Sequence, residues 1–418
     1  MKLKDLIQDS SKYFLIKIIR ILPPFLMLPI LTSYLLPEEY GKFTLILLIV
    51  NLFVPIVGLS SQAFLQVNYY KKLSNYKEQF GTALSSVLIL SVFLLFVLYL
   101  FQDLFTDLTT LENRFIPFIV VLIFLRIIHL INQSHYQVTK NFFLYGFSET
   151  SVSLIYLTFG IVFITMFNYS WYYLIYIQIA TYFLINCYNL IKLKATQVFD
   201  YDFNCKIQKD IIRYGLPLIP HSISIYLFNS IDRFFINHFI GIKETGIYSV
   251  SIQLGLAISI MFVSFNTAFV PYLFKLLSED AKKTVRVFKV IFVILVLTFL
   301  ISLSLYLIFP LIQHLIIGEK YQKAIDYLPW VFMTQFFMGS QMIFGNFLFY
   351  FERTNLIAFL SLISLMLNIT LTYCFIPKLG EIGAALSSTI SAFVYFLLTL
   401  VLSIKQLKIN QLNGVQRI

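Results

Sequence analysis

The residues best suited to chemistry are polar side chains inside an otherwise apolar run at residues 115–135. Arg126 lies near the middle of this run, and His129 and Gln133 follow it at helical spacing, with Asn132 nearby. Residues three and four apart share one face of a helix. An ionisable group at membrane depth is costly, so this cationic stripe predicts a site for an anion. The alternative is a hydrogen-bonded cluster that only holds helices together.

A second pair of cations, Lys17 and Arg20, lies three residues apart in an earlier apolar run, residues 13–36. Both are close enough to the expected inner surface to reach the lipid headgroups, which is the alternative to a functional role. Arg20 is the deeper of the two. Three prolines follow and favour a bent helix, namely Pro23, Pro24 and Pro29.

A third group lies in the apolar run at residues 214–240, where Asn229 and Arg233 share one helical face and Asp232 precedes Arg233. An acid next to a base at membrane depth predicts an ion pair, either functional or one that fixes helix packing. Pro217 and Pro220 favour a bend in the same helix.

These side chains require a membrane scaffold to position them. The chain has 418 residues, of which 59% are hydrophobic and only 12% are charged. A soluble domain carries about 25% charged residues, so most of this surface must face lipid. About 20 apolar residues span a bilayer, and the sequence predicts an all-α integral membrane protein with about twelve such helices. The predicted spans are 13–36, 41–65, 82–102, 115–135, 149–168, 171–192, 214–240, 246–274, 287–312, 327–350, 355–376 and 382–404.

The connectors between these runs predict the orientation. If the N-terminus is inside, 21 of the 31 lysines and arginines lie in inside segments, 6 lie in outside segments, and the rest lie within the runs. Positive residues collect on the cytoplasmic side, so both termini are expected there. The net charge of +11 is thereby explained by topology, and no nucleic-acid partner is expected.

The longest polar connector, residues 193–209, divides the chain into an N-terminal lobe at 1–200 and a C-terminal lobe at 201–418. Six helices in each lobe give both the same orientation, as in a parallel repeat. The first outside turn of each lobe has glutamate, then glycine two residues later, then an aromatic residue two beyond. These turns are Glu39-Tyr40-Gly41-Lys42-Phe43 and Glu244-Thr245-Gly246-Ile247-Tyr248.

Missing features also guide the interpretation. No expected helix centre carries an acidic residue, and Glu149 is expected at the inner end of its helix. Exporters of organic cations need buried carboxylates, so an anionic substrate is favoured. No metal-ligand spacing, P-loop, nucleophile elbow or dinucleotide fingerprint is present, so neither a metal, a cofactor nor catalytic residues are expected.

Three motifs together resemble one family. They are Leu36-Pro37-Glu38-Glu39-Tyr40-Gly41, then Arg213-Tyr214-Gly215-Leu216-Pro217-Leu218-Ile219-Pro220 with Asp232-Arg233-Phe234, and Leu379-Gly380-Glu381-Ile382-Gly383-Ala384-Ala385. These are similar to Wzx-type polysaccharide repeat-unit flippases (O-antigen, capsule or exopolysaccharide transporters) of the multidrug/oligosaccharidyl-lipid/polysaccharide exporter superfamily. The resemblance covers essentially the whole chain.

The resemblance implies a transporter rather than an enzyme, with two six-helix lobes around a cavity. It implies a substrate in which an oligosaccharide is joined by pyrophosphate to a polyprenol, moved from the cytoplasmic to the outer leaflet of the bacterial plasma (inner) membrane. Pyrophosphate cannot enter hydrocarbon without paired cations. We therefore expect substrate binding by five residues and an outer gate at Asp232 and Arg233. The five are Arg126, Arg20, His129, Gln133 and Asn229.

Two alternatives remain at this stage. A multidrug or cation antiporter of the same superfamily is disfavoured by the missing acidic residues, and a membrane polysaccharide polymerase by the short outside connectors. Membrane lipid is an expected partner, and a polysaccharide polymerase and a chain-length regulator are candidate partners.

Overall fold

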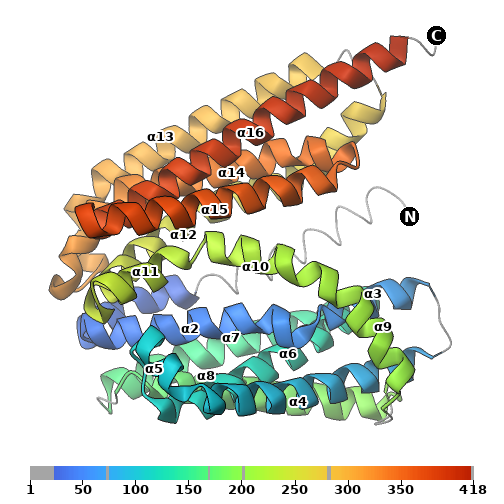
Figure 1. Cartoon of the computed structure of the whole chain (residues 1–418), viewed down its shortest axis with the longest axis vertical. Coiled ribbons are helices and arrows are strands. Elements are labelled where there is room, and N and C mark those ends of the chain that lie inside the picture. The colour runs from blue at the N-terminus through green and yellow to red at the C-terminus, as the bar shows by residue number, and fades with distance from the viewer. Residues whose placement is uncertain (1–22, 72–74, 168–169, 200–202, 280–283, 416–418) are drawn as a thin grey trace. The chain divides into compact units, whose positions relative to one another are not determined.

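The computed structural model describes residues 23–71, 75–167, 170–199, 203–279 and 284–415, and every regular element in these ranges is a helix (Figure 1). Nine helices in these ranges are long and apolar enough to cross a membrane. The expectation of an all-α membrane protein is confirmed.

Three further expected spans complete a set of about twelve. The run 13–36 is described only from residue 23 and is helical over 23–34. The run 214–240 is divided into shorter helices. The run 327–350 is one helix, Leu328–Tyr350, without a charged residue, and its buried amides Gln335 and Gln341 reduce its hydropathy.

The chain divides into two compact units, Met1–Tyr226 and Leu227–Ile418. The elements of unit 1 are α2 (Pro37–Gly58), α3 (Ser61–Tyr70), α4 (Tyr76–Leu100), α5 (Gln102–Thr109), η1 (Asn113–Phe115), α6 (Ile116–Val138), α7 (Phe142–Thr165), α8 (Tyr173–Ala195), α9 (Cys205–Gly215), η2 (Leu216–Leu218) and most of α10 (Ile219–Phe228). Those of unit 2 are α11 (Ile231–Phe239), α12 (Ile242–Glu279), α13 (Thr284–Ile316), η4 (Glu319–Tyr327), α14 (Leu328–Tyr350), α15 (Thr354–Leu379) and α16 (Glu381–Val415).

The boundary between units follows the end of the connector helix α9, because this helix packs on unit 1. The side chain of Ser86 on α4 bonds Gln208 on α9, and the backbone N–H of Asn204 donates to Thr82 at 3.2 Å. The expected six-helix lobes at 1–200 and 201–418 stay a prediction.

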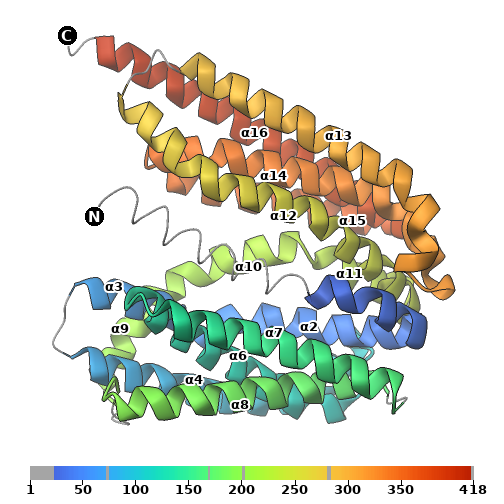
Figure 2. The same cartoon turned by 180° about the vertical axis from the view of Figure 1, so that it is seen from behind.

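Helix α6 is the centre of unit 1, since it packs against α2, α3, α4, α7 and α8. Its apolar side chains, including Ile119, Leu122, Ile123 and Ile127, are fully buried. In unit 2, α14 and α16 pack closely together, and α12 and α15 lie beside them (Figures 1 and 2). A polar residue on a buried face of α6 therefore packs against neighbouring helices.

Two expected helices are interrupted. The run 41–65 divides at Leu59 and Ser60, which both have left-handed backbone angles, with φ of 45° and 50°. Gly215 packs onto this break so closely that a Cβ would collide with the Leu59 carbonyl oxygen. Position 215, within the motif at residues 213–220, therefore requires glycine for steric reasons.

The second interruption lies in the run 214–240. The prolines were expected to bend this helix, and the segment around Pro217 is a 3₁₀ turn. A further break, without proline, separates α10 from α11 at Asn229 and Ser230. The turn motif at Leu36–Gly41 also has a local role: Pro37 begins α2, and the Glu39 carboxylate accepts a 2.9 Å bond from the Leu36 N–H.

Candidate functional site

Arg126 is the eleventh residue of the 23-residue helix α6, about 15 Å from its start at 1.5 Å per residue. Its guanidinium donates to the amide oxygen of Asn51 on α2 at 2.7 Å and to that of Gln178 on α8 at 3.1 Å. It also lies over the ring of Tyr182 on α8, 5.7 Å from the centroid. Two neighbouring helices, α2 and α8, thus hold the arginine of α6.

All of these partners are neutral. Within the described part of the chain, no carboxylate forms an ion pair with Arg126. Its Nε is buried and has no hydrogen-bond partner among the described residues. Amides satisfy two of the donors but cannot cancel the charge, so the site keeps a full positive charge and a free donor.

His129 lies one turn after Arg126 and is buried with Glu149 of α7. The His129 Nε2 to Glu149 Oε1 distance is 3.6 Å, and the two side chains are 6% and 7% exposed. The His129 ring also contacts the Tyr182 ring edge-on, with centroids 5.3 Å apart. Tyr182 therefore contacts both Arg126 and His129.

The position of Glu149 corrects an expectation. It was expected at the inner end of a helix starting near residue 149. Helix α7 instead begins at Phe142, because the Asn141 side chain caps it by accepting from the Leu144 N–H at 3.1 Å. Glu149 consequently lies two turns inside and is buried.

Gln133 is also buried, and neither of its amide atoms has a partner among the described residues. Arg126 and His129 both contact the Tyr182 ring, and Gln133 lies one turn further along α6. Arg20 lies outside the described residues.

Sequence reasoning missed the matching face of α8. Its polar residues are spaced four, four and three apart: Gln178, Tyr182, Asn186 and Asn189. Asn132 of α6 donates to Asn186 at 3.3 Å, and Asn189 accepts from Tyr136 of α6 at 3.1 Å and from Ser148 of α7 at 3.0 Å. We call this set the polar seam; it consists of Arg126, His129, Asn132, Gln133, Tyr136, Ser148, Glu149, Gln178, Tyr182, Asn186 and Asn189.

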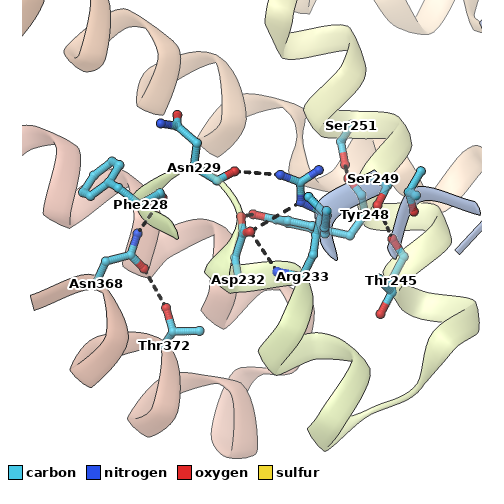
Figure 3. A network of polar contacts seen from close by, with 12 residues as sticks. Phe228, Asn229, Asp232, Arg233, Thr245, Tyr248, Ser249, Ser251, Asn368 and Thr372 are labelled. Carbon is cyan, nitrogen blue, oxygen red and sulfur yellow. Dashed lines mark hydrogen bonds and ion pairs between the residues drawn. The ribbon is translucent and has the colours of Figure 1, made fainter. Parts of the chain in front are cut away.

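The group expected at the outer gate forms a separate network in unit 2 (Figure 3). Asp232 is buried; its carboxylate accepts from the Tyr248 hydroxyl at 2.9 Å and from the Arg233 N–H at 2.8 Å. The Arg233 Nε is 3.6 Å from the same carboxylate, and its Nη2 donates to the Asn229 carbonyl oxygen at 2.7 Å. Asn229 contributes its backbone here, while its side chain is exposed. These contacts favour a packing role, and the gate stays a prediction.

The network also caps the break between α10 and α11. Asn368 of α15 donates to the Phe228 carbonyl oxygen at 3.3 Å and accepts from Thr372 at 2.9 Å. Side chains thus satisfy two carbonyls that lack a helical partner, as buried backbone groups require (Figure 3). The described residues contain no cluster of three or more His, Cys, Asp or Glu that could hold a metal ion.

Comparison with known proteins gives consistent results across the chain. A family model described as "Polysaccharide biosynthesis protein" matches residues 6–277, and the MatE model matches residues 217–374. A protein of the Lsg locus of Haemophilus influenzae is 25% identical over 410 residues, covering 93% of this chain and 97% of its own. An uncharacterized membrane protein of the same organism is 24% identical over 387 residues, covering 87% and 88%.

Solved structures share the fold at low identity. The lipid II flippase MurJ, in an inward closed conformation, superposes with a TM-score of 0.75 at 14% identity, covering 97% of this chain and 91% of its own. An inward-facing multidrug resistance MATE family transporter of the MOP superfamily has a TM-score of 0.69 at 14% identity, covering 94% and 98%. These families and neighbours are transporters and flippases, not enzymes.

Proposed function

The chain belongs to the polysaccharide biosynthesis protein family, and from this premise we propose that it is a Wzx-type flippase. It is a multi-pass membrane transporter of the MOP superfamily. As a flippase it translocates a polyprenyl-pyrophosphate-linked oligosaccharide repeat unit from the cytoplasmic to the outer leaflet, for surface polysaccharide biosynthesis.

The observation that carries this proposal is the uncompensated charge of Arg126. The structure offers an internal comparison, since Arg233 also lies at membrane depth but has Asp232 as its counter-charge. Among the described residues, Arg126 contacts amide oxygens and an aromatic ring but no carboxylate. A cation at membrane depth without a counter-charge is unfavourable unless an anion binds it during function.

The guanidinium geometry suits a phosphate group. Its planar donors form two parallel bonds with phosphate oxygens, and Nε is already free for one of them. Asn51 and Gln178 hold the plane in place and can exchange their oxygens for those of the phosphate. The polyprenyl chain stays in the bilayer, so only the pyrophosphate and sugars need a polar route.

The other site assignments follow as parts of the proposal. His129 and Gln133 line the same face as Arg126 and supply donors to the headgroup, with Arg20 and Asn229 as further contacts. The inner membrane with both termini cytoplasmic is the proposed location, and a polysaccharide polymerase and a chain-length regulator are the proposed partners.

A multidrug or cation antiporter is the second candidate, and two observations favour it. The acids Glu149 and Asp232 are both buried, and exporters of organic cations need buried carboxylates. The MatE model also matches residues 217–374. In unit 1, however, Glu149 lies 3.6 Å from His129, whereas no carboxylate among the described residues pairs with Arg126.

The test is complementation of a strain that lacks this gene. Arg126→Gln should abolish surface polysaccharide and trap lipid-linked repeat units inside the cell. Arg126→Lys keeps the positive charge but cannot bind phosphate in a bidentate manner, so it should restore part of the export. Arg114→Gln is the matched control, since Arg114 is exposed and pairs with Glu112. Normal export by Arg126→Gln, present in the membrane at the wild-type level, would contradict the proposal. Trapping outside the cell would indicate a polymerase instead.

A further inference from the structure

Helix α9 differs from the spanning helices of unit 1 in length and direction. It has 11 residues, packs against α3 and α4, and runs across them rather than along them (Figures 1 and 2). The Asn204 side chain caps it by accepting from the Lys206 N–H at 2.9 Å and from the Ile207 N–H at 3.4 Å. Its apolar side chains Ile207 and Ile211 are buried. The helix is therefore a fixed element that lies crosswise on unit 1.

The contacts of α9 with α4 indicate its depth in the bilayer. From Phe80 to Leu100, α4 has 21 residues without a charge, all its charged residues lying before this stretch. Such a stretch is about 31 Å long at 1.5 Å per residue, which matches the hydrocarbon thickness of about 30 Å. The Asn204 N–H donates to Thr82 of α4, only two residues inside the stretch. The helix α9 thus lies near the boundary between hydrocarbon and headgroups.

The exposed side of α9 combines a basic strip with an apolar strip. Lys206, Lys209 and Arg213 are exposed and lie within about 60° of one another around the helix axis, at about 100° per residue. Ile212 and Leu216, which are 39% and 58% exposed, form the adjoining apolar strip. Among the described residues, none of the three cations has an ion-pair partner. We call these five residues the α9 surface.

This combination suits the headgroup of an anionic phospholipid. A helix that lies in the interface places its apolar side chains at the top of the acyl chains, while Lys and Arg reach the phosphates. Each Lys or Arg beside an anionic leaflet gives an about fivefold preference. The nearby exposed acid Asp210 opposes this attraction in part. Topology alone accounts for cations on one side of the membrane, but it does not require an exposed apolar strip beside them.

We propose that the α9 surface binds anionic phospholipid. The three cations bind the phosphate oxygens, and the acyl chains pack on Ile212 and Leu216. A zwitterionic lipid carries no net charge, so the surface selects against it. The proposal requires a membrane protein but no particular substrate, so it goes beyond the proposed function and is tested separately from it.

The experiment measures which lipid contacts α9 in a bilayer. Cys205, the exposed first residue of α9, is labelled with bimane in the full-length protein carrying Cys187→Ala and Cys374→Ala, which remove the other two thiols. The protein is reconstituted in equal amounts of phosphatidylglycerol and phosphatidylcholine, and either one or the other carries brominated chains that quench bimane on contact. Brominated phosphatidylglycerol should quench about threefold more or better at low salt. The preference should disappear at about 1 M NaCl, where the screening length is about 3 Å.

Charge variants assign the preference to α9. The triple variant Lys206→Gln/Lys209→Gln/Arg213→Gln should quench equally with both brominated lipids, because the basic strip is gone. Asp210→Asn should increase the preference for phosphatidylglycerol up to about fivefold, because it removes the opposing charge. A misfolded protein does not produce such a gain.

The matched control removes three exposed lysines of unit 1 that lie on helices other than α9. Lys71→Gln/Lys77→Gln/Lys192→Gln should keep the preference, because these residues end α3, begin α4 and end α8. Loss of the preference in this control would mean that the overall charge of unit 1 attracts the lipid, and would overturn the proposal.

Three other results would also overturn it: equal quenching by the two lipids at low salt, a preference that the α9 triple variant retains, or no quenching by either lipid. The comparison of two lipids at two salt concentrations needs no change of charge in the protein. It therefore decides even if the triple variant does not fold.

Discussion

The buried Asp232–Arg233 pair should be strongly coupled energetically, despite a longer separation than an ion pair elsewhere in unit 2. Its Nε to Oδ1 distance is 3.6 Å, with side chains 13% and 4% exposed. The Lys323–Glu381 pair is closer at 2.8 Å, but the Lys323 side chain is 51% exposed. Removing one partner of a buried pair leaves an uncompensated charge and costs about 3–5 kcal/mol. An exposed pair contributes about 0–1 kcal/mol.

The contacts of Asp232 and Arg233 indicate how much folding stability each variant should lose. Asp232→Asn removes the counter-charge of Arg233, and Arg233→Gln leaves a buried carboxylate held by the Tyr248 hydroxyl and a backbone N–H. Each single change should therefore cost about 3 kcal/mol or more. The double variant has no charge to compensate and should cost less than the sum, with a coupling energy of about 2–3 kcal/mol.

The assay is reversible unfolding in mixed micelles with increasing SDS, applied to both double-mutant cycles. Glu381→Gln and Lys323→Met provide the exposed cycle, where a coupling below about 1 kcal/mol is expected. Burial, rather than distance, is the reason for the difference. A coupling of Asp232 with Arg233 that is no larger than that of Lys323 with Glu381 would refute this reasoning.

Three further outcomes are expected. Gly215→Ala should destabilise by about 1–3 kcal/mol in the same unfolding assay, because its Cβ would overlap a carbonyl of the α2–α3 break. A Cβ at Gly345 would meet only the Gln341 side chain, at an ordinary contact distance of 3.5 Å, so Gly345→Ala should gain up to about 1 kcal/mol in its helix; equal effects would contradict the steric argument. The pKa of the Lys323 ammonium is raised, chiefly by its hydrogen bond to Glu381. The contribution of this lysine to folding stability is therefore complete below pH 10.5 and is lost as pH rises through the folded pKa. The free energy of unfolding measured from pH 9 to 12 should show this loss in the wild type and not in Glu381→Gln. Tyr182→Leu should weaken farnesyl pyrophosphate binding about threefold to tenfold, while Tyr182→Phe keeps the aromatic face and binds normally; equal binding by the two would exclude the ring contact.

The helices could be predicted because lipid imposes a simple rule: a run of apolar residues long enough to span forms a helix with all its backbone bonds internal. The breaks within these helices could not be predicted. Leu59 and Ser60 are ordinary helix residues in sequence, and their left-handed angles depend on packing by Gly215, far along the chain. Asn229 and Ser230 form a break because Asn368 and Arg233 satisfy the freed carbonyls.

The candidate site was partly predictable for a related reason. Arg126 and His129 stand out because charge is rare in apolar runs, and their shared face follows from spacing alone. Whether Arg126 has a counter-charge depends on which residues of α2 and α8 face it in the folded protein, and the local sequence around Arg126 does not contain that information. The start of α7 was placed too late because one cap, Asn141, was not recognised, and this error concealed the buried Glu149.

The break at Asn229 and Ser230 has a mechanical consequence. It follows the point where the chain passes from unit 1 to unit 2, between Tyr226 and Leu227, by only two residues. Bending a continuous helix there would break its own backbone hydrogen bonds. At this break, the side chains of Arg233 on α11 and Asn368 on α15 bind the backbone carbonyl oxygens instead. The chain can therefore bend at this break without losing the backbone hydrogen bonds of α10 or α11.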